Sequence, residues 1–333
     1  MKYLVVGAGL SGCVIARELA KAGHSVDVID KRDHVAGNAY DYENEHGIRV
    51  HKYGPHLFHT NNEEVFEWLS HFTEWVEYRH KVKAQLSDGQ YVTLPVNRET
   101  KDIVGEENVL DVFFRPYTKK MWGVELDQLN PDIINRVPIR DDYNEEYFPN
   151  DKIQYMPRHG YTQMVENILT RHNIHVYLQT EYSSHMNENY DHVFNSMPID
   201  EYFKFKHGKL PYRSIKFETM SLPIPQALPT ATVNFTHHGP KTRVTEWKNI
   251  PCHGDNKYIT TLTFEEPCDY SENNFERYYP VKDRDGKNRE LYKKYKAEIP
   301  EHMTFIGRCG LYAYLDMHQA VSTALSTVRK FLA

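Results

Sequence analysis

The stretch that decides the fold is KYLVVGAGLSGCVIARELAKAGHSVDVID, residues 2–30. The β-branched run over residues 2–6 predicts a strand, and the pattern from Cys13 to Ala22 predicts a helix after a glycine-rich turn. A second apolar run then ends at Asp30. A strand, a glycine turn, a helix and a second strand with a terminal acid are the parts of a Rossmann dinucleotide-binding unit.

The residues of this unit have distinct physical tasks. Gly7 permits the tight turn, Gly9 lets a pyrophosphate approach the backbone, and Gly12 lets the helix pack closely on the strand. The N-terminus of the helix offers free N–H groups to the phosphates. Asp30 lies where a carboxylate is expected to hold a pair of ribose hydroxyls.

Two further features favour FAD over NAD. A second glycine turn, Gly37-Asn38, follows Asp30, and a long cofactor has more need of glycine there than NAD has. Residues 304–308 predict a strand that ends in Gly-Arg and leads to a last helix, whose apolar residues recur at helical spacing over residues 321–332. This segment completes the core, and its end can also touch the cofactor.

The composition disfavours several classes of protein. The 333 residues include 40 Lys+Arg and 46 Asp+Glu, and the formal net charge of −6 argues against a nucleic-acid or membrane-surface binder. Mean hydropathy is −0.68, and no apolar run is long enough to span a membrane. The four cysteines have no close pair spacing, so we expect neither disulfides nor a metal site and predict a cytoplasmic protein.

The rest of the chain interrupts the dinucleotide-binding unit twice. Residues 106–122 predict a helix that Pro116 divides, and Asn130-Pro131 predicts a short helix that ends near Arg136. A hairpin pattern around Asp88-Gly89 and an extended pattern over residues 212–263 predict a second sheet. The predicted fold class is α/β, with a Rossmann-like FAD-binding domain (1–77, 152–200 and 296–333) interrupted by a small helical substrate-binding domain (98–151) and an antiparallel β-sheet domain (78–97 and 201–295).

Several longer motifs lie along the chain in a fixed order. They are GAGLSG (7–12), GN (37–38), YGPHLFHT (53–60), YTKKMWG (117–123), RVPIR (136–140), GYTQM (160–164), TRVTE (242–246), YYP (278–280), GR (307–308) and YLDM (314–317). On these motifs the chain resembles the bacterial UDP-galactopyranose mutase family over nearly its whole length. It departs from the family pattern in two places: the segment between residues 97 and 111 is shorter, and Ala36 stands where a glycine is usual.

The resemblance implies a flavoenzyme that interconverts UDP-galactopyranose and UDP-galactofuranose without net oxidation. It implies that reduced flavin attacks the anomeric carbon through its N5 while UDP leaves. It also implies that NAD(P)H can serve as reductant and that the protein is a homodimer in cell-surface polysaccharide biosynthesis, with no metal ion. The residues expected to bind FAD are Gly7, Gly9, Leu10, Ser11, Gly12, Asp30, Lys31, Gly37, Asn38, His56, Arg308, Tyr314, Asp316 and Met317.

The resemblance also assigns the substrate side. Cations must hold the diphosphate, and Arg suits this task because its planar fork donates two hydrogen bonds. Arg136 and Arg243 are expected in that role, although Arg140, four residues after Arg136, competes for it. His56 is expected beside the flavin, where it can tune or relay a proton. The expected substrate-binding residues are Phe113, Phe114, Tyr117, Trp122, Arg136, Tyr147, Arg243, Tyr279, Tyr314 and His59.

Alternatives remain open at this stage. Phe113 and Tyr117, four residues apart, share a helix face on which a uracil can stack, but spacing alone places such aromatic residues more often in the core. A flavin-dependent oxidoreductase of the amine-oxidase-like class shares the Rossmann opening and would oxidise its substrate. A non-catalytic binding protein similar to the GDP-dissociation inhibitors would not depend on a flavin.

Overall fold

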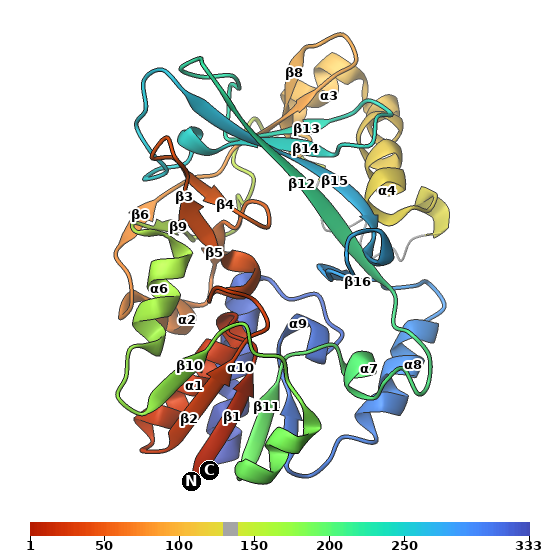
Figure 1. Ribbon diagram of the computed structural model, residues 1–333. Helices are drawn as coiled ribbons and strands as arrows, with labels where there is room; N and C mark the ends of the chain where they lie inside the picture. Colours follow the sequence, from red (N-terminus) through yellow and green to blue (C-terminus); the bar gives the residue numbers. More distant parts are fainter. Residues whose placement is uncertain (129–138) are drawn as a thin grey trace.

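The computed structural model describes residues 1–128 and 139–333. Its lower layer in Figure 1 is a five-stranded parallel sheet with the strand order β10-β2-β1-β11-β17. β2 and β10 lie on one side of β1, and β11 and β17 lie on the other. The strand order therefore reverses at β1, and a dinucleotide is expected in the crevice at the carboxyl end of this strand. The strands are β1 (Lys2–Val6), β2 (Ser25–Ile29), β10 (Ile174–Tyr177), β11 (His192–Asn195) and β17 (Met303–Phe305).

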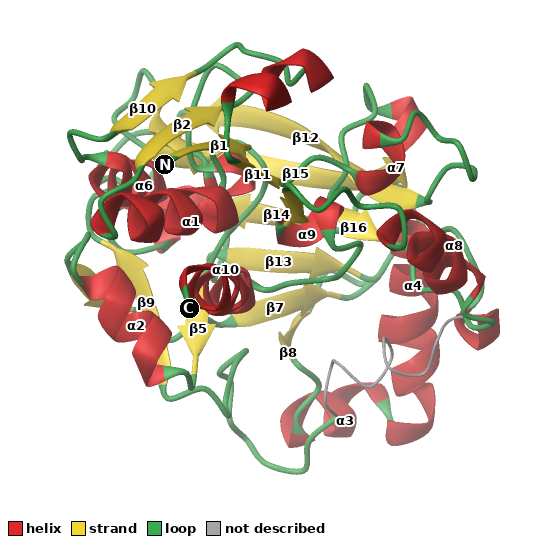
Figure 2. Cartoon of the chain, turned by 90° about the horizontal axis from the view of Figure 1, so that it is seen from below, coloured by secondary structure: helices red, strands yellow, loops and turns green. Residues whose placement is uncertain are grey.

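Different helices cover the two faces of this sheet. Tyr3 and Val5 of β1 pack with residues of α1, α6 and α10, whereas Leu4 and Val6 pack on the other face with residues of α7 and α8. Alternate side chains of a strand point to opposite faces, which explains this division. The helices are α1 (Leu10–Lys21), α6 (Gly160–Leu169), α7 (Ile199–Tyr202), α8 (Lys287–Lys296) and α10 (Met317–Leu332), and Figure 2 shows α1 and α10 side by side below the sheet.

A seven-stranded sheet forms the upper layer in Figure 1, with the order β16-β12-β15-β14-β13-β7-β8. Its pairings are antiparallel except that β7 and β13 are parallel, a pairing that the predicted antiparallel sheet did not include. The predicted hairpin around Asp88-Gly89 is confirmed as β7 and β8. The strands are β7 (Val82–Gln85), β8 (Tyr91–Leu94), β12 (Tyr212–Leu222), β13 (Thr232–Phe235), β14 (Arg243–Glu246), β15 (Thr260–Asp269) and β16 (Tyr279–Pro280).

The helical insertion lies beside this sheet. It contains α3 (Arg98–Val104), 3-10 turns at 106–108 and 126–128, a π-helical stretch over Leu110–Phe114, and α4 (Arg115–Trp122). Pro116 lies in the first turn of α4, where the π-helical stretch changes to α-helix. Phe114 and Arg115 both keep helical backbone angles, so the proline does not divide the helix as predicted. The short helix predicted at Asn130-Pro131, together with Arg136, lies outside the described residues.

Smaller elements connect the two layers. They are β3 (Asp41–Glu43), β4 (Arg49–His51), β5 (Phe58–Thr60), α2 (Glu63–Ser70), β6 (Trp75–Glu77), β9 (Ile153–Pro157), α9 (Gly307–Gly310) and 3-10 turns at 37–39, 184–189, 247–249 and 270–272. The predicted strand over residues 304–308 is wrong at its end: β17 stops at Phe305, and Gly307, with φ +70°, turns the chain into α9.

The predicted α/β class is therefore confirmed, whereas the domain boundaries stay a prediction. In the part of the chain that the structure describes, none of the helices combines the length and apolar character needed to cross a membrane.

Candidate functional site

The carboxyl edge of the parallel sheet is packed too closely for side chains at its first turn. Gly7 has φ +102°, and a Cβ atom there would lie 1.9 Å from Oγ of Ser196. A Cβ atom on Gly12 would lie 2.0 Å from the carbonyl oxygen of Gly7. Only glycine fits these positions, so the backbone of the turn and the N-terminus of α1 stay accessible to a phosphate.

The second glycine turn touches the first. A Cβ atom on Gly37 would lie 2.9 Å from Cα of Gly9, and Gly9 forms a β-bridge with Ala36. Ala36 has φ +70°, a left-handed conformation that glycine adopts at less cost than alanine. The two turns thus form one cradle at the mouth of the crevice.

Asp30 lies after β2 and is held in place by backbone groups. Its Oδ2 accepts a hydrogen bond from the N–H of Ala8 at 2.8 Å, and its Oδ1 accepts one from the N–H of Arg32 at 2.9 Å. Each carboxylate oxygen has a further lone pair for a ribose hydroxyl. Lys31, which the sequence singled out, is exposed, and the neighbouring Arg32 is the inward residue.

Arg32 contacts the second glycine turn, and the sequence analysis did not single it out. Its guanidinium donates to Oδ1 of Asn38 at 2.9 Å, forms an ion pair with Glu276 at 2.7 Å and lies 4.3 Å from the ring centre of Tyr53. It therefore ties the second glycine turn to the segment before β16. No local motif predicts that Arg32, and not Lys31, turns inward. The partner that forms the ion pair, Glu276, lies 244 residues farther along the chain.

The tail of the chain reaches the same edge. Ser11 Oγ donates to the carbonyl oxygen of Ala320 at 3.3 Å, which places the start of α1 against α10. Asp316 caps α10 in a capping box with Gln319. Met317 follows as the first residue of α10, and the positive end of this helix dipole lies at the same edge as the start of α1.

These features fit FAD. The cradle excludes a Cβ atom at Gly7, Gly12 and Gly37, and Asp30 offers carboxylate oxygens to a ribose. The N-termini of α1 and α10 meet at one edge. Two helix N-termini suit a cofactor that carries a pyrophosphate at one end and a polar ring system at the other.

Arg243 and Glu265 form an ion pair among the residues expected to bind the substrate. They are cross-strand partners on β14 and β15, and Nε of Arg243 lies 2.8 Å from Oε1 of Glu265. Burial lowers the pKa of Arg243, but attraction to Glu265, Tyr279 and Tyr117 outweighs burial and raises it. Burial raises the pKa of Glu265, and the Arg243 charge opposes that rise. Glu265, which the sequence analysis missed, holds Arg243 in place and charged.

Aromatic side chains surround this pair. The rings of Tyr279 and Tyr314 stack with centres 5.6 Å apart and planes at 12°, and the Arg308 guanidinium lies 4.9 Å from the centre of the Tyr314 ring. Trp122 packs edge-on against Tyr279 at 6.4 Å. Burial raises the pKa of Tyr279 to about 12, so its hydroxyl keeps its proton and can donate to an anion.

Tyr117 is close enough to this group for electrostatic coupling. Desolvation by the surrounding protein raises its pKa, opposed by Arg243, and Tyr147, Tyr279 and Tyr314 raise it further. Phe113, one turn earlier, is buried in the cluster with the β7–β8 hairpin, and Phe114 and Tyr147 pack against that cluster. For Phe113 the core alternative describes the packing, and its ring is not presented as openly as that of Tyr117.

Of the two arginines proposed as alternatives, Arg140 lies within the described residues. Arg140 donates to the carbonyl oxygens of Asn144 at 2.6 Å and Glu146 at 3.3 Å, so its guanidinium holds the loop over residues 140–146. Arg136 lies outside the described residues.

The two histidines of the 53–60 motif have different surroundings. His56 Nδ1 donates to the carbonyl oxygen of Gly54 at 2.9 Å, and burial, with Arg308 and Arg243 adding to it, lowers the pKa of His56 to about 4. His59 Nδ1 lies 2.6 Å from Oδ2 of Asp151, and its ring stacks on Phe148 at 3.6 Å. His56 is thus neutral and close to the cationic groups, whereas His59 is paired with a carboxylate.

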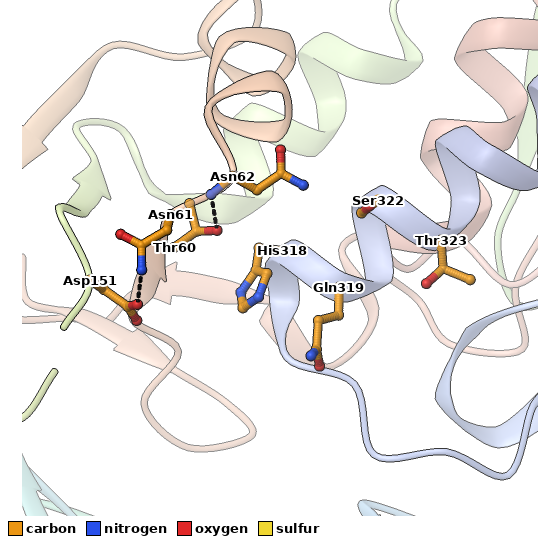
Figure 3. A pocket seen from close by; sticks show the side chains of 8 residues that line it. All are labelled: Thr60, Asn61, Asn62, Asp151, His318, Gln319, Ser322 and Thr323. Carbon is orange, nitrogen blue, oxygen red and sulfur yellow. Dashed lines mark hydrogen bonds between the residues drawn. The ribbon is translucent and has the colours of Figure 1, made fainter.

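Two pockets open near these residues. A polar pocket of about 370 Å³, shown in Figure 3, lies beside Asp151 at the start of α10 and is lined by Thr60, Asn61, Asn62, Asp151, His318, Gln319, Ser322 and Thr323. A second pocket of about 610 Å³ is lined by Trp122, Val124, Gln128, Val281, Lys282, Asp283, Arg284, Asp285, Lys287 and Asn288. The second pocket has the volume of a small-molecule site and includes Trp122 of the aromatic group.

The fold and this edge define a flavoprotein with a Rossmann-type cofactor crevice, beside which arginine and tyrosine side chains gather. The family model for UDP-galactopyranose mutase matches residues 112–314, and a model for NAD(P)-binding Rossmann-like domains matches residues 5–72. A probable UDP-galactopyranose mutase of Klebsiella pneumoniae is 35% identical, with 99% of this chain and 94% of that protein covered. A dTDP-fucopyranose mutase of Escherichia coli is 31% identical, with 99% and 98% covered.

Solved structures agree on the fold. A crystal structure of reduced UDP-galactopyranose mutase superposes with a TM-score of 0.77 at 15% identity, covering 99% of this chain and 93% of that one. A putrescine oxidase variant superposes with a TM-score of 0.59 at 14% identity, covering 99% and 98%. The chain belongs to the UDP-galactopyranose mutase family; it is an isomerase with FAD as its cofactor.

Proposed function

We propose that this protein interconverts UDP-galactopyranose and UDP-galactofuranose with no net oxidation. The observation that carries the proposal is the Arg243–Glu265 pair, whose carboxylate is buried and whose guanidinium is partly exposed, close to Tyr117, Tyr279 and His56. A cation fixed there can hold a diphosphate leaving group beside the cofactor. Reduced FAD, when bound, supplies the nucleophile for the anomeric carbon.

The diphosphate is held by arginines and tyrosines in this proposal. Arg243 presents its guanidinium to the phosphate oxygens, with Arg136 as the second cation. The hydroxyls of Tyr147, Tyr279 and Tyr314 donate to the same oxygens; the raised pKa of Tyr279 keeps its hydroxyl protonated as charge develops on the leaving group. The nucleotide thus stays near the sugar for reattachment.

The uracil and sugar lie against aromatic side chains in this proposal. Tyr117 supplies the open stacking surface, backed by the buried Phe113 and the adjacent Phe114. Trp122 borders the sugar, supported by its place at the 610 Å³ pocket. His56 faces the reacting centre as an uncharged acceptor, and His59 lies farther out with Asp151.

The remaining assignments are also proposals. We infer that the cofactor-binding residues are those of the two glycine turns, Asp30, Arg308 and the 314–317 segment, with Arg32 in place of Lys31 as the inward side chain. We infer a homodimer in the cytoplasm, reduced by NAD(P)H. The presence of all four cysteines as free thiols supports a reducing compartment.

The test is anaerobic incubation of the FAD-loaded, dithionite-reduced protein with UDP-galactofuranose. Formation of UDP-galactopyranose, with little conversion by the oxidised protein, is the expected result. Parallel reactions with a dTDP-fucofuranose probe show which nucleotide and sugar are preferred. If well-folded, reduced holoenzyme converts the dTDP sugar and not the UDP sugar, the substrate assignment is wrong; conversion of neither rejects the function.

A further inference from the structure

Two fully buried histidines lie behind His56 and have no assigned role. His51 ends β4, and His253 lies in the loop after the 3-10 turn at 247–249. Nε2 of His51 is 2.9 Å from Nε2 of His253. The backbone N of His56 is 3.1 Å from Nδ1 of His51, and Nδ1 of His253 is 2.8 Å from the carbonyl oxygen of Pro251. These contacts form one continuous hydrogen-bonded line.

The groups at the two ends of this line fix its direction. A backbone N–H can only donate, so Nδ1 of His51 must be an unprotonated acceptor. A carbonyl oxygen can only accept, so Nδ1 of His253 must carry a proton. With both rings neutral, one arrangement remains: Nε2–H of His51 donates to the lone pair of Nε2 on His253. The line therefore runs from His56 through both rings to Pro251.

A proton added to either ring would break this line. On His51 it would face the N–H of His56, and on His253 it would face Nε2–H of His51. Burial lowers the pKa of His51 well below its ordinary value and that of His253 to about 4, and Arg49 adds to both effects. Asp41, 3.9 Å from His51, is beyond hydrogen-bond distance and accepts instead from the N–H groups of Tyr161 and Thr162. The rings of Tyr161 and Trp247 cover His51.

The same logic assigns the ring of His56. Its Nδ1 donates to the carbonyl oxygen of Gly54, so Nε2 carries a lone pair. Gly54, at φ +85°, makes the turn that brings this carbonyl back toward the ring, and a Cβ atom there would lie 2.9 Å from the Phe217 ring. The backbone of His56 is thus held from behind by His51, while its side chain is oriented by its own turn.

We propose that His51 and His253 are positioning residues, whose one-directional hydrogen-bond line fixes the 54–56 turn so that His56 presents Nε2 as an uncharged acceptor to the cofactor and sugar. The proposal rests on the proposed function for the place of His56 beside the reacting centre. The arrangement of protons in the line does not depend on the identity of the sugar.

The test compares His253→Leu with the matched variant His253→Gln, both loaded with FAD. Leu removes the acceptor for His51, which is then free to take the other tautomer and lose the bond from His56; Gln places an amide oxygen near the former Nε2. We expect His253→Leu to lose about tenfold in kcat with a less than twofold change in KM. We expect a shift of the flavin potential equivalent to about tenfold, or roughly 30 mV for two electrons. We expect His253→Gln to keep most of the parental kcat and most of the parental flavin potential.

Three results would overturn the proposal. They are an unchanged kcat and potential in folded, FAD-loaded His253→Leu, an equal loss in the Gln variant, and ¹⁵N NMR of the unmodified holoenzyme showing Nδ1–H on His51 at pH 7. The NMR measurement needs no variant, so it decides even if the Leu variant does not fold. Potential and tautomer are measured without sugar turnover, so failure of the proposed substrate leaves this test intact.

Discussion

The cofactor crevice and the proposed substrate side differ in which parts of the chain shape them. The crevice is shaped by backbone in contact with backbone: Gly7 with Gly12, and Gly9 with Gly37. The proposed substrate side is shaped by long side chains from β14, β15, β16, α4 and α9, around one ion pair whose carboxylate is buried. The crevice therefore has no room for a Cβ atom at Gly7, Gly12 or Gly37. On the substrate side, a side chain can be replaced without moving the backbone of the two layers.

Gly12→Ala adds an atom inside the crevice and is expected to have the largest effect, a loss of bound FAD. The new Cβ atom would lie 2.0 Å from the Gly7 carbonyl oxygen, and 3.0 Å from a methyl carbon of Val5, so α1 must move off β1. We expect purified protein without stoichiometric FAD, measured by flavin absorbance per chain.

Gly23→Ala is the matched control, because a Cβ atom at Gly23 has nothing within 4 Å although φ is +90°. It should cost about 1 kcal/mol of stability from backbone strain alone and keep its FAD. A Gly12→Ala protein with a full complement of flavin would show that the crevice can expand, which contradicts the contrast between the two regions.

The second-largest effect is expected from low pH, which should lower the stability of the fold through buried histidines. Burial lowers the pKa of His80 to about 3 and that of His253 to about 4. These rings are neutral in the folded protein and take up protons on unfolding, so stability is complete above pH 6.5 and falls as the pH drops toward the folded values. Each of these two histidines should lower the free energy of unfolding by roughly 2 kcal/mol between pH 6.5 and pH 5. Urea unfolding at both pH values measures this loss.

His80→Asn is the control for the acid effect. His80 Nδ1 lies 3.0 Å from the Tyr78 hydroxyl, and an Asn carbonyl oxygen can accept that bond without titrating. The variant should lose less stability between pH 6.5 and 5 than the parent does. An equal loss would remove His80 from the acid response.

Arg243→Lys tests the ion pair while keeping a charge beside Glu265. Lys lacks the planar fork that holds phosphate oxygens in two directions, so we expect kcat/KM to fall about 100-fold, about 3 kcal/mol, while FAD content stays complete. Lys216→Ala, an exposed change on β12, should have no effect. Near-parental activity of Arg243→Lys would remove the guanidinium from the diphosphate role.

The same contrast explains what could be predicted from the sequence. The glycines, Asp30 and the first helix are close in sequence, and their spacing alone predicted the crevice. Arg32 and Glu265 were missed because their roles depend on partners far along the chain, Glu276 for one and a cross-strand arginine for the other. Phe113 and Tyr117 share a spacing that fits both core and site, and only packing on the β7–β8 hairpin distinguishes them.

Tyr279→Phe should have the smallest effect and probes the outer layer of the substrate side. The change keeps the ring, and with it the stack on Tyr314 at 5.6 Å and the edge contact with Trp122, but removes the hydroxyl proposed to donate to the diphosphate. One hydrogen bond to a charged oxygen is worth about 1.5 kcal/mol, so kcat/KM should fall roughly tenfold.

Steady-state kinetics and flavin absorbance of this variant sharpen the comparison together. FAD content and melting temperature should match the parent, as should those of Tyr258→Phe, a control on a side chain that is 80% exposed. Loss of FAD from Tyr279→Phe would mean that the hydroxyl serves the crevice instead. Unchanged kinetics would mean that the ring alone is needed, and the diphosphate would then rest on the arginines and the other tyrosines.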